Sequence, residues 1–242
     1  MTAALELGGL VKRFGGLTAT NDFSADVAEG ESVGLIGPNG AGKTTIFSLI
    51  MGEHRLNEGA IHLRGAPIQD LPMHERIKRG VARTYQVPRP FAGMSVAENI
   101  RIGLAPDSLR AMIFGAPDPA EERALAEAVG FTGADLDRMP SELSMGDLRK
   151  LELARTLATG ADVVLLDEVF AGLTVGEIAQ ISALIDEKRR AGVTFVIVSH
   201  DLRALEPLID RAIAMTAGAK IAEGAYGDVI ADEAVRASYL GT

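Results

Sequence analysis

Hydrophobic and polar positions change their period several times along the chain. Near the start, Phe23, Ala25 and Val27 alternate with polar residues, which predicts a half-buried antiparallel strand. Short apolar runs further along are typical of buried strands, and there are three of them: Val33–Ile36, Val163–Leu166 and Phe195–Val198. The chain therefore contains both half-buried and fully buried strands.

Helical spacing separates these runs. Apolar residues recur every three or four positions at Ile178, Ile181, Leu184 and Ile185. Strands that alternate with helices predict a parallel sheet covered on both faces. From about Val87 to Arg155 the spacing is helical without a strong strand, and one helix face there holds Leu148, Leu151, Ala154 and Ala158. We predict an α/β core from residues 1–86 and 156–242 with an inserted helical subdomain at 87–155, in which the Gly- and Pro-containing segment 105–119 is irregular or mobile.

Composition narrows the classes of protein. The 242 residues carry 33 acidic and 24 basic side chains, a formal net charge of −9, and no cysteine. Disulfides, thiolate metal sites and cysteine nucleophiles are excluded. The first residues lack the apolar segment of a secretory signal, and the apolar runs are far shorter than the ~18 residues of a spanning helix. We expect a soluble cytosolic protein, and the acidic balance argues against general nucleic-acid binding.

A glycine-rich loop follows the first buried run and precedes the apolar start of a helix. Its sequence matches G-x-x-x-x-G-K-[ST], a pattern that binds phosphates between a strand and a helix. Backbone N–H groups and the helix N-terminus would surround the phosphates, Lys43 would reach the β- and γ-phosphates, and the Thr44 hydroxyl would hold Mg²⁺. The candidate phosphate-binding residues are Gly37, Asn39, Gly40, Ala41, Gly42, Lys43, Thr44 and Thr45.

Polar residues also follow the other two buried runs. Asp167 and Glu168 end one of them, at the edge where an α/β sheet presents its ligands. Asp167 would orient Mg²⁺ through a water, and Glu168 would act as general base. His200 follows the other run and could bind the γ-phosphate and hold the attacking water. Alone, two adjacent acids more often begin a solvated loop, and a single histidine is usually unremarkable; the phosphate loop upstream favours the functional interpretation.

The order of these motifs resembles the ATP-binding-cassette (ABC) ATPases. The phosphate loop is followed by Gln86, then by Leu143-Ser144-Met145-Gly146-Asp147, then by Asp167-Glu168 and His200. Within that superfamily the chain is most similar to ATPase subunits of branched-chain amino acid importers and of related amide or urea importers, through Lys12–Leu17, Ala82–Val96, Ala171–Leu173 and Ala237–Gly241. The resemblance implies a P-loop NTPase (RecA-like) core with a mainly parallel sheet, an N-terminal antiparallel β subdomain and an inserted helical subdomain.

The resemblance also implies roles and partners. Two cassettes would close head to tail around two ATP molecules with Mg²⁺, and the second cassette is expected to be a paralogue. Phe14, which without the motif would be a core residue, would stack on adenine. Gln86 would contact Mg²⁺ or the water, and Ser144 and Gly146 would bind the γ-phosphate held by the partner cassette. Residues 88–96 would receive a cytoplasmic helix of a membrane subunit. Two permease subunits and, indirectly, a solute-binding protein complete the expected assembly, without nucleic acid, at the cytoplasmic face of the inner membrane.

The chain departs from the family pattern in its signature, Leu-Ser-Gly-Gly-Gln in relatives. Ser144 and Gly146 remain, but Met145 and Asp147 are unusual. Ser144 and Asp147 also have the spacing of a helix capping box. A carboxylate ~7 Å from a γ-phosphate would cost roughly 2 kcal/mol at an effective dielectric constant near 20. This predicts that the ATP site completed by this chain's signature is slower or weaker than the site built on its own phosphate loop. Val169 stands where relatives usually carry a proline, which affects the turn after Glu168. Thr174 stands where relatives often carry Asp or Asn, which affects the loop that links the two sites.

Three alternatives remain. Transport direction follows from the resemblance alone, so an ATPase of a lipid or other exporter is possible. A DNA-maintenance ATPase of the same fold would insert long coiled coils between Gln86 and Leu143, but only 57 positions separate them. A nucleotide-binding regulator that does not hydrolyse is disfavoured by the presence of Gln86, Glu168 and His200.

Overall fold

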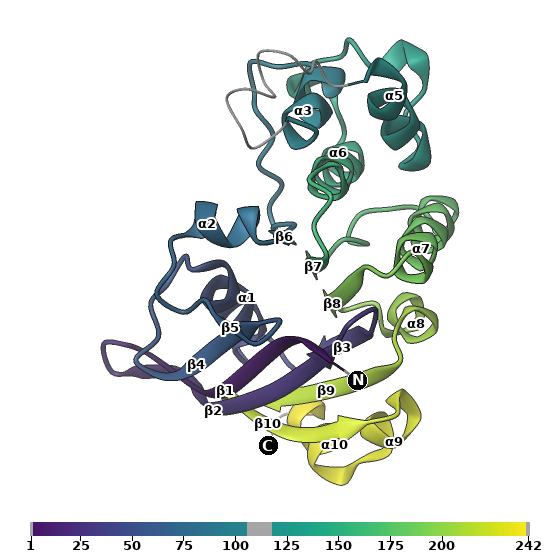
Figure 1. The fold of residues 1–242 in the computed structure, drawn as a ribbon. Helices are drawn as coiled ribbons and strands as arrows, with labels where there is room; N and C mark the ends of the chain where they lie inside the picture. Colours follow the sequence, from purple (N-terminus) through teal and green to yellow (C-terminus); the bar gives the residue numbers. More distant parts are fainter. Residues whose placement is uncertain (1, 106–117, 241–242) are drawn as a thin grey trace.

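A computed structural model describes residues 2–105 and 118–240, which form two sheets and a helical region (Figure 1). The first sheet has the order β2-β1-β4-β5 and is antiparallel throughout. Its strands are β1 (Ala3–Phe14), β2 (Leu17–Ala28), β4 (Glu58–Leu63) and β5 (Ala66–Pro67). In β2 the alternating residues Phe23, Ala25 and Val27 are buried, which confirms the predicted half-buried antiparallel strand.

The second sheet has six strands in the order β10-β9-β3-β8-β7-β6. Its pairs are parallel except for β9 with β10, which is antiparallel. The strands are β3 (Ser32–Ile36), β6 (Val81–Arg83), β7 (Val163–Asp167), β8 (Thr194–Val198), β9 (Arg211–Thr216) and β10 (Ala219–Gly224). The three predicted apolar runs are β3, β7 and β8, and every residue of these strands is buried.

Each face of the parallel sheet has its own hydrophobic core. Along β7, Val163 and Leu165 belong to one core, and Val164 and Leu166 to the other. The first core is closed by the antiparallel sheet and α1, and the second by α7, the helical region and the C-terminal helices. The helices outside the helical region are α1 (Lys43–Met51), α2 (Met73–Lys78), α7 (Val175–Arg190), α8 (Leu202–Leu205), η3 (Glu206–Leu208), α9 (Tyr226–Ala231) and α10 (Glu233–Leu240).

The helical region is joined to the edge of the sheet formed by β6 and β7 (Figure 1). It contains α3 (Val96–Gly103), α5 (Pro119–Ala128), η1 (Gly133–Asp135), η2 (Pro140–Glu142) and α6 (Met145–Ala158). Helix α6 packs against α3 and α5, and of its predicted apolar face Leu151, Ala154 and Ala158 lie in the core, whereas Leu148 is half-buried outside it. Of the segment expected to be irregular, residues 106–117 lie outside the described residues, and Pro119 begins α5.

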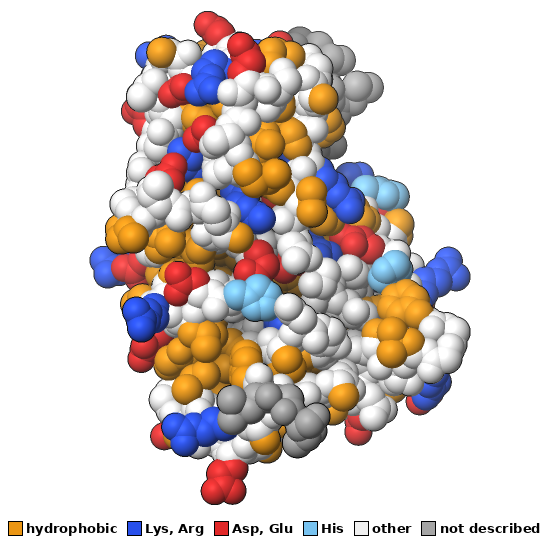
Figure 2. All heavy atoms as spheres, turned by 180° about the vertical axis from the view of Figure 1, so that it is seen from behind, with side chains coloured by type: hydrophobic (Ala, Val, Ile, Leu, Met, Phe, Trp, Pro, Cys, Tyr) orange, Lys and Arg blue, Asp and Glu red, His pale blue; other side chains and the backbone are white. Residues whose placement is uncertain are grey.

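The surface agrees with the acidic composition. On the face turned away from the reader in Figure 1, basic and acidic side chains are interspersed and form no continuous basic patch (Figure 2). Among residues 2–105 and 118–240, no helix has the length and apolar character needed to cross a membrane.

Candidate active site

The glycine-rich loop joins β3 to α1 and is folded tightly against neighbouring strands. A Cβ atom at Gly37 (φ +149°) would lie 2.2 Å from the Met215 carbonyl oxygen in β9. One at Gly42 (φ +104°) would lie 2.4 Å from the carbonyl oxygen of Ala19 in β2. Both positions also have a backbone conformation that favours glycine. The loop conformation is therefore fixed by close backbone contacts, and Asn39, Gly40, Ala41 and Gly42 line a cleft together with the start of α1.

Lys43, the first residue of α1, lies inside this loop. Its Nζ donates to the carbonyl oxygens of Gly37 at 2.6 Å and Pro38 at 3.0 Å. Burial lowers the pKa of Lys43, while the nearby carboxylates of Glu168 and Asp167 act in the opposite direction. The loop thus holds a nearly buried ammonium group at its centre, where a phosphate would find a charged donor.

Asp167 ends β7 with one carboxylate oxygen fixed and the other free. Oδ2 accepts a hydrogen bond from Arg83 Nη2 at 2.8 Å, and the Asp167 N–H donates to Thr84 Oγ1 at 2.9 Å. Burial raises the pKa of Asp167, and the hydrogen bond from Arg83 opposes that rise. Oδ1 is buried without a hydrogen-bond partner among the described residues. Such an oxygen is costly to bury and suits a cation ligand.

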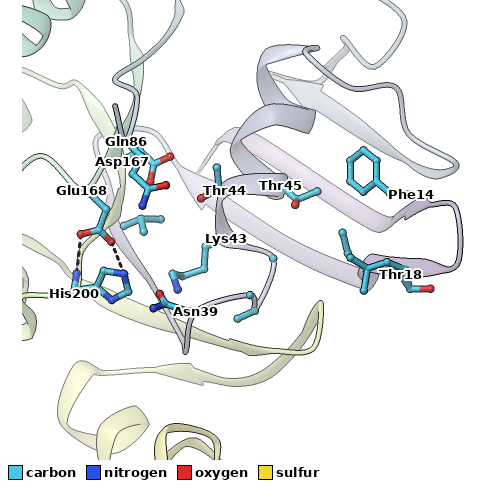
Figure 3. Close-up of a pocket in the computed structure, with 16 residues that line it drawn as sticks. Phe14, Thr18, Asn39, Lys43, Thr44, Thr45, Gln86, Asp167, Glu168 and His200 are labelled. Carbon is cyan, nitrogen blue, oxygen red and sulfur yellow. Dashed lines mark hydrogen bonds and ion pairs between the residues drawn. The ribbon is translucent and has the colours of Figure 1, made fainter. Parts of the chain in front are cut away.

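Glu168 is held at the cleft in an unusual conformation. Its φ of +55° lies in the left-handed region, which is rare for a residue with a side chain. Oε2 accepts a hydrogen bond from the His200 N–H at 3.1 Å, and Oε1 lies 3.3 Å from His200 Nε2 (Figure 3). Burial raises the pKa of Glu168, and the His200 N–H acts against the rise. A raised pKa favours a carboxylate as a proton acceptor near neutral pH.

These groups surround one cleft of about 580 Å³. Phe14 lies at the end of the cleft away from Glu168, and Gln86 lies beside Asp167 (Figure 3). The predicted residues that line the cleft are Phe14, Asn39, Gly40, Ala41, Gly42, Lys43, Thr44, Thr45, Gln86, Asp167, Glu168 and His200. Gly37 forms the base of the loop without lining the cleft, and Ser144 and Gly146 lie outside it, on α6 and its cap.

Phe14 has an exposed ring. It is 40% exposed, its centroid lies 5.0 Å from that of His54 in an edge-on arrangement, and Lys12 Nζ lies 4.8 Å from its centroid. Leu17, Thr18 and Ala19 follow on β2 and also line the cleft, with Thr18 next to Phe14 (Figure 3). This end therefore offers a flat apolar surface next to the phosphate loop.

Sequence reasoning missed two residues that hold Asp167. Arg83 is nearly buried and also pairs with Glu53 at 3.1 Å and donates to Ser48 Oγ at 3.0 Å. Thr84 anchors the Asp167 backbone. One sequence signal was available: Arg83 directly follows the apolar residues Val81 and Ala82 in a segment that ends at Gln86. An arginine in such a segment is expected to be buried, and a buried arginine needs an acidic partner.

Comparison with known proteins gives the same architecture. Residues 20–171 match the ABC transporter family. The chain belongs to the ABC transporter family. It is an ATP-binding cassette, and its ATP hydrolysis drives transport.

Relatives of the cassette align with nearly its whole length. It is 35% identical to the high-affinity branched-chain amino acid transport ATP-binding protein LivG of Salmonella typhimurium, over 98% of this chain and 97% of LivG. It is 34% identical to the corresponding protein BraF of Pseudomonas aeruginosa, with the same coverage. Among solved structures, a nucleotide-free ATP-binding cassette from an ABC transporter matches with a TM-score of 0.86 and 30% identity, covering 99% of this chain and 100% of that one. The expected fold is confirmed.

In the signature of this cassette, the polar side chains form hydrogen bonds and ion pairs with one another. Ser144 caps α6: its hydroxyl accepts from the Asp147 N–H at 3.1 Å and donates to Asp147 Oδ2 at 2.7 Å, so the predicted capping box is present. Lys150 Nζ lies 2.7 Å from Asp147 Oδ1 and 2.8 Å from Glu177 Oε1. Burial tends to raise the pKa of Asp147, but hydrogen bonds from Lys150 and Ser144 outweigh it and lower that pKa.

Proposed function

We propose that this cassette hydrolyses Mg²⁺-ATP to drive an importer of branched-chain amino acids or of related amides or urea. Two lines of support meet here. LivG and BraF, which align over nearly their full length, are named for branched-chain amino acid transport. Between Gln86 and Leu143, the described residues form only short helices, which leaves the coiled coils of a DNA-maintenance ATPase without support.

The observation that carries the Mg²⁺-dependent chemistry is a pair of buried carboxylate oxygens that accept no hydrogen bond among the described residues: Asp167 Oδ1, and Glu168 Oε1, which lies 3.3 Å from His200 Nε2. They share one cleft with Lys43 and Thr44, so the residues present fit a metal-bound triphosphate. Asp167, the Thr44 hydroxyl and Gln86 would hold Mg²⁺. When bound, the ion would polarise the phosphates and offset their charge.

The residues of this chain would each have a distinct role in binding and hydrolysis. The phosphate loop and Lys43 bind the β- and γ-phosphates, and the ring of Phe14 stacks on adenine. Glu168 Oε1 accepts a proton from the attacking water while the bond to the γ-phosphorus forms and ADP leaves. His200, which lies against the same carboxylate, orients that water and contacts the γ-phosphate.

Assembly completes the site. A second cassette, a paralogue, would pack head to tail so that Ser144 and Gly146 face the nucleotide bound by that partner. A groove of about 330 Å³ lies next to the helical region and is lined by Tyr85, Arg89, Phe91 and Arg155 among others. We assign this groove to a cytoplasmic helix of one of two permease subunits. A solute-binding protein would deliver the solute to these permeases. The cassette would thus be a peripheral protein at the cytoplasmic face of the inner membrane.

The general-base assignment is tested by Glu168→Gln. This variant removes the proton acceptor and keeps the shape, so hydrolysis should fall by about 10²- to 10⁴-fold while ATP binding persists and the closed dimer accumulates. ATPase assays, nucleotide titration and size-exclusion chromatography measure these effects. Glu187→Gln, on the exposed end of α7, is the matched control. Hydrolysis by Glu168→Gln at the parental rate would show that another group accepts the proton.

The solute class is tested separately. The cassette is reconstituted with its permeases and binding protein, and leucine, an aliphatic amide and urea are each tested for stimulation of ATP hydrolysis. Stimulation by leucine supports the branched-chain assignment, and stimulation by the amide or urea alone supports the related importers. A response to none of the three contradicts the proposed solute class.

A further inference from the structure

Glu152 is a nearly buried carboxylate of α6 that has no place in the chemistry above. It is 3% exposed, and both of its oxygens are used. Oε2 accepts a hydrogen bond from the Tyr85 N–H at 3.0 Å, and Oε1 accepts one from the Arg89 N–H at 3.3 Å. These two amides stand on either side of Gln86, so a single side chain of α6 holds the loop that carries this residue.

The loop has few other backbone donors. Pro88 and Pro90 lack an N–H, so residues 85–90 contain four amide donors, and two of them point to Glu152. The guanidinium groups of Arg83 and Arg89 lie 4.9 Å and 4.5 Å from the centre of the Tyr85 ring. The loop is therefore fixed at its base and on its far side, while Gln86 and Val87 between the anchors are exposed.

The chemistry of the acceptor matters. Only an ionised carboxylate offers two equivalent oxygens, each able to accept a backbone N–H; a glutamine offers one oxygen, and its amide nitrogen would face the other N–H. Burial raises the pKa of Glu152, and the N–H groups of Tyr85 and Arg89 act against that rise, so the two hydrogen bonds favour the ionised form that offers both oxygens. A glutamate at position 152 can therefore hold both N–H groups of the loop, whereas a glutamine could hold only one.

Arg149 makes a parallel contact one helical turn earlier. Its Nη1 donates to the Glu168 carbonyl oxygen at 3.0 Å. Glu168 is the residue with the left-handed backbone, so this bond holds an unfavourable conformation in place. Arg149 and Glu152 are three residues apart on α6 and thus lie on one face of that helix.

We propose that Glu152 is a positioning residue for Gln86, and that together with Arg149 it ties the loops after β6 and β7 to the signature helix. Ser144 caps α6 eight residues before Glu152, about 12 Å along a rigid helix. A displacement of α6 when its signature engages the partner's nucleotide would then reach Gln86 and Glu168 in this chain's own cleft. The inference rests on the proposed function, because it assigns the purpose of the contact to those two residues.

Amide exchange tests the contact without nucleotide. In the full chain, Glu152→Ala and Glu152→Gln should speed hydrogen exchange at Tyr85 and Arg89 by about tenfold or more, whereas Glu152→Asp should restore part of the protection. Glu122→Gln is the matched control, since Glu122 is an equally buried carboxylate of the helical region that pairs with Arg101 at 2.7 Å and does not touch the loop. Unchanged exchange at both amides in Glu152→Ala would overturn the proposal.

Kinetics separates positioning from general stability. Glu152→Ala should slow single-turnover hydrolysis of Mg²⁺-ATP by about tenfold or more. ATP affinity without Mg²⁺ should stay within about twofold, because Gln86 acts through Mg²⁺ and the attacking water, and neither takes part in metal-free binding. Adding Glu152→Ala to Gln86→Ala should slow hydrolysis little further, since both changes remove the same contribution. A loss that Glu122→Gln reproduces at an equal loss of thermal stability would mean that Glu152 only supports the fold.

The proposed function and this inference fail in different ways. If Gln86→Ala hydrolyses ATP at the parental rate, the role of Gln86 is wrong, whatever the exchange data show. If Gln86→Ala is slow but Glu152→Ala is as fast as the parent, Gln86 acts in the reaction and Glu152 does not position it. Arg149→Met tests the contact between α6 and Glu168 in the same way. The Ala171 N–H donates to the Glu168 carbonyl oxygen, so faster hydrogen exchange at Ala171 would support the proposed role of Arg149. Unchanged exchange at Ala171 would show that Arg149 does not hold this loop.

Discussion

The cleft and the signature cap are two polar sites of this cassette, and their polar groups differ in how far they are hydrogen-bonded. In the cleft, Asp167 and Glu168 each keep a buried oxygen that accepts no hydrogen bond among the described residues. At the cap, Ser144, Asp147 and Lys150 satisfy one another, and Glu177 closes the network. The first site is prepared for a ligand, whereas the second must give up existing hydrogen bonds before it can bind one.

This difference has an energetic consequence. An unpartnered buried oxygen costs free energy that a ligand recovers on binding, so the cleft gains from occupation. At the cap, the Ser144 hydroxyl would have to leave the Asp147 carboxylate in order to donate to a phosphate. If the partner cassette carries a different signature, the two ATP sites of the proposed head-to-tail dimer would differ, and the following changes test how far the contrast between cleft and cap extends.

The largest effect is expected when the cleft loses its own internal partner. Arg83→Ala leaves Asp167 buried without its ion pair, which typically costs about 3–5 kcal/mol of folding free energy. Urea unfolding measures the loss. Arg64→Ala is the matched control, because Arg64 pairs with Asp162 at the surface and such pairs contribute about 0–1 kcal/mol. A loss below about 1 kcal/mol in Arg83→Ala would show that the cleft tolerates an unpaired Asp167.

The next effect concerns the far end of the cleft. Phe14→Ala removes the exposed ring proposed to stack on adenine, and stacking on an aromatic ring contributes about 1–3 kcal/mol, so ATP affinity should fall roughly tenfold or more. Isothermal titration calorimetry gives the dissociation constant. Phe14→Tyr keeps the ring and should bind nearly as well as the parent. An unchanged dissociation constant in Phe14→Ala would mean that the ring only packs against His54 and Lys12.

The sequence predicted the cleft better than it predicted what supports it. The phosphate loop and Asp167-Glu168 stand next to each other in space because each follows a buried strand of one parallel sheet, and strand ends can be located from apolar runs. Phe14 and Gln86 came from the resemblance, since no local pattern marks either residue.

The supporting contacts were invisible for a physical reason. Arg83 with Asp167, and Glu152 with Tyr85, join residues more than 60 positions apart, and their pairing depends on which helix packs on which strand. The short strand β6 has only three residues, too few for a period to be recognised. By contrast, the capping box at Ser144 was predictable because both partners lie within one helical turn.

A smaller effect is expected at the edge of the cap network, and it depends on pH. Hydrogen bonds from Lys150 and from Thr174 lower the pKa of Glu177 to about 2. A lowered folded-state pKa means that Glu177 stabilises the fold above the unfolded value, near 4.5, and that this contribution is lost as pH falls towards 2. Glu177→Ala should therefore cost about 1 kcal/mol at pH 7 and progressively less below pH ~4.5.

Urea unfolding of parent and variant at pH 7, 5, 4 and 3 measures this convergence. Glu187→Ala, at the exposed end of the same helix, should differ from the parent by a constant small amount at all four values. A Glu177→Ala difference that stays constant with pH would show that the network does not depend on the charge of Glu177.

The smallest effect is expected from Asp147→Gln, which tests the contrast most directly. Glutamine can still complete a capping box, so stability should change by less than about 1 kcal/mol. Removing the carboxylate frees the Ser144 hydroxyl and removes a negative charge, but Lys150 already lies 2.7 Å from that charge and compensates it. The gain at the ATP site that this signature completes should therefore be several-fold, below the roughly 2 kcal/mol of an uncompensated carboxylate ~7 Å away. Turnover of the assembled transporter, compared between the parent and Asp147→Gln, measures this gain, and unchanged turnover would mean that the cap network does not limit the site.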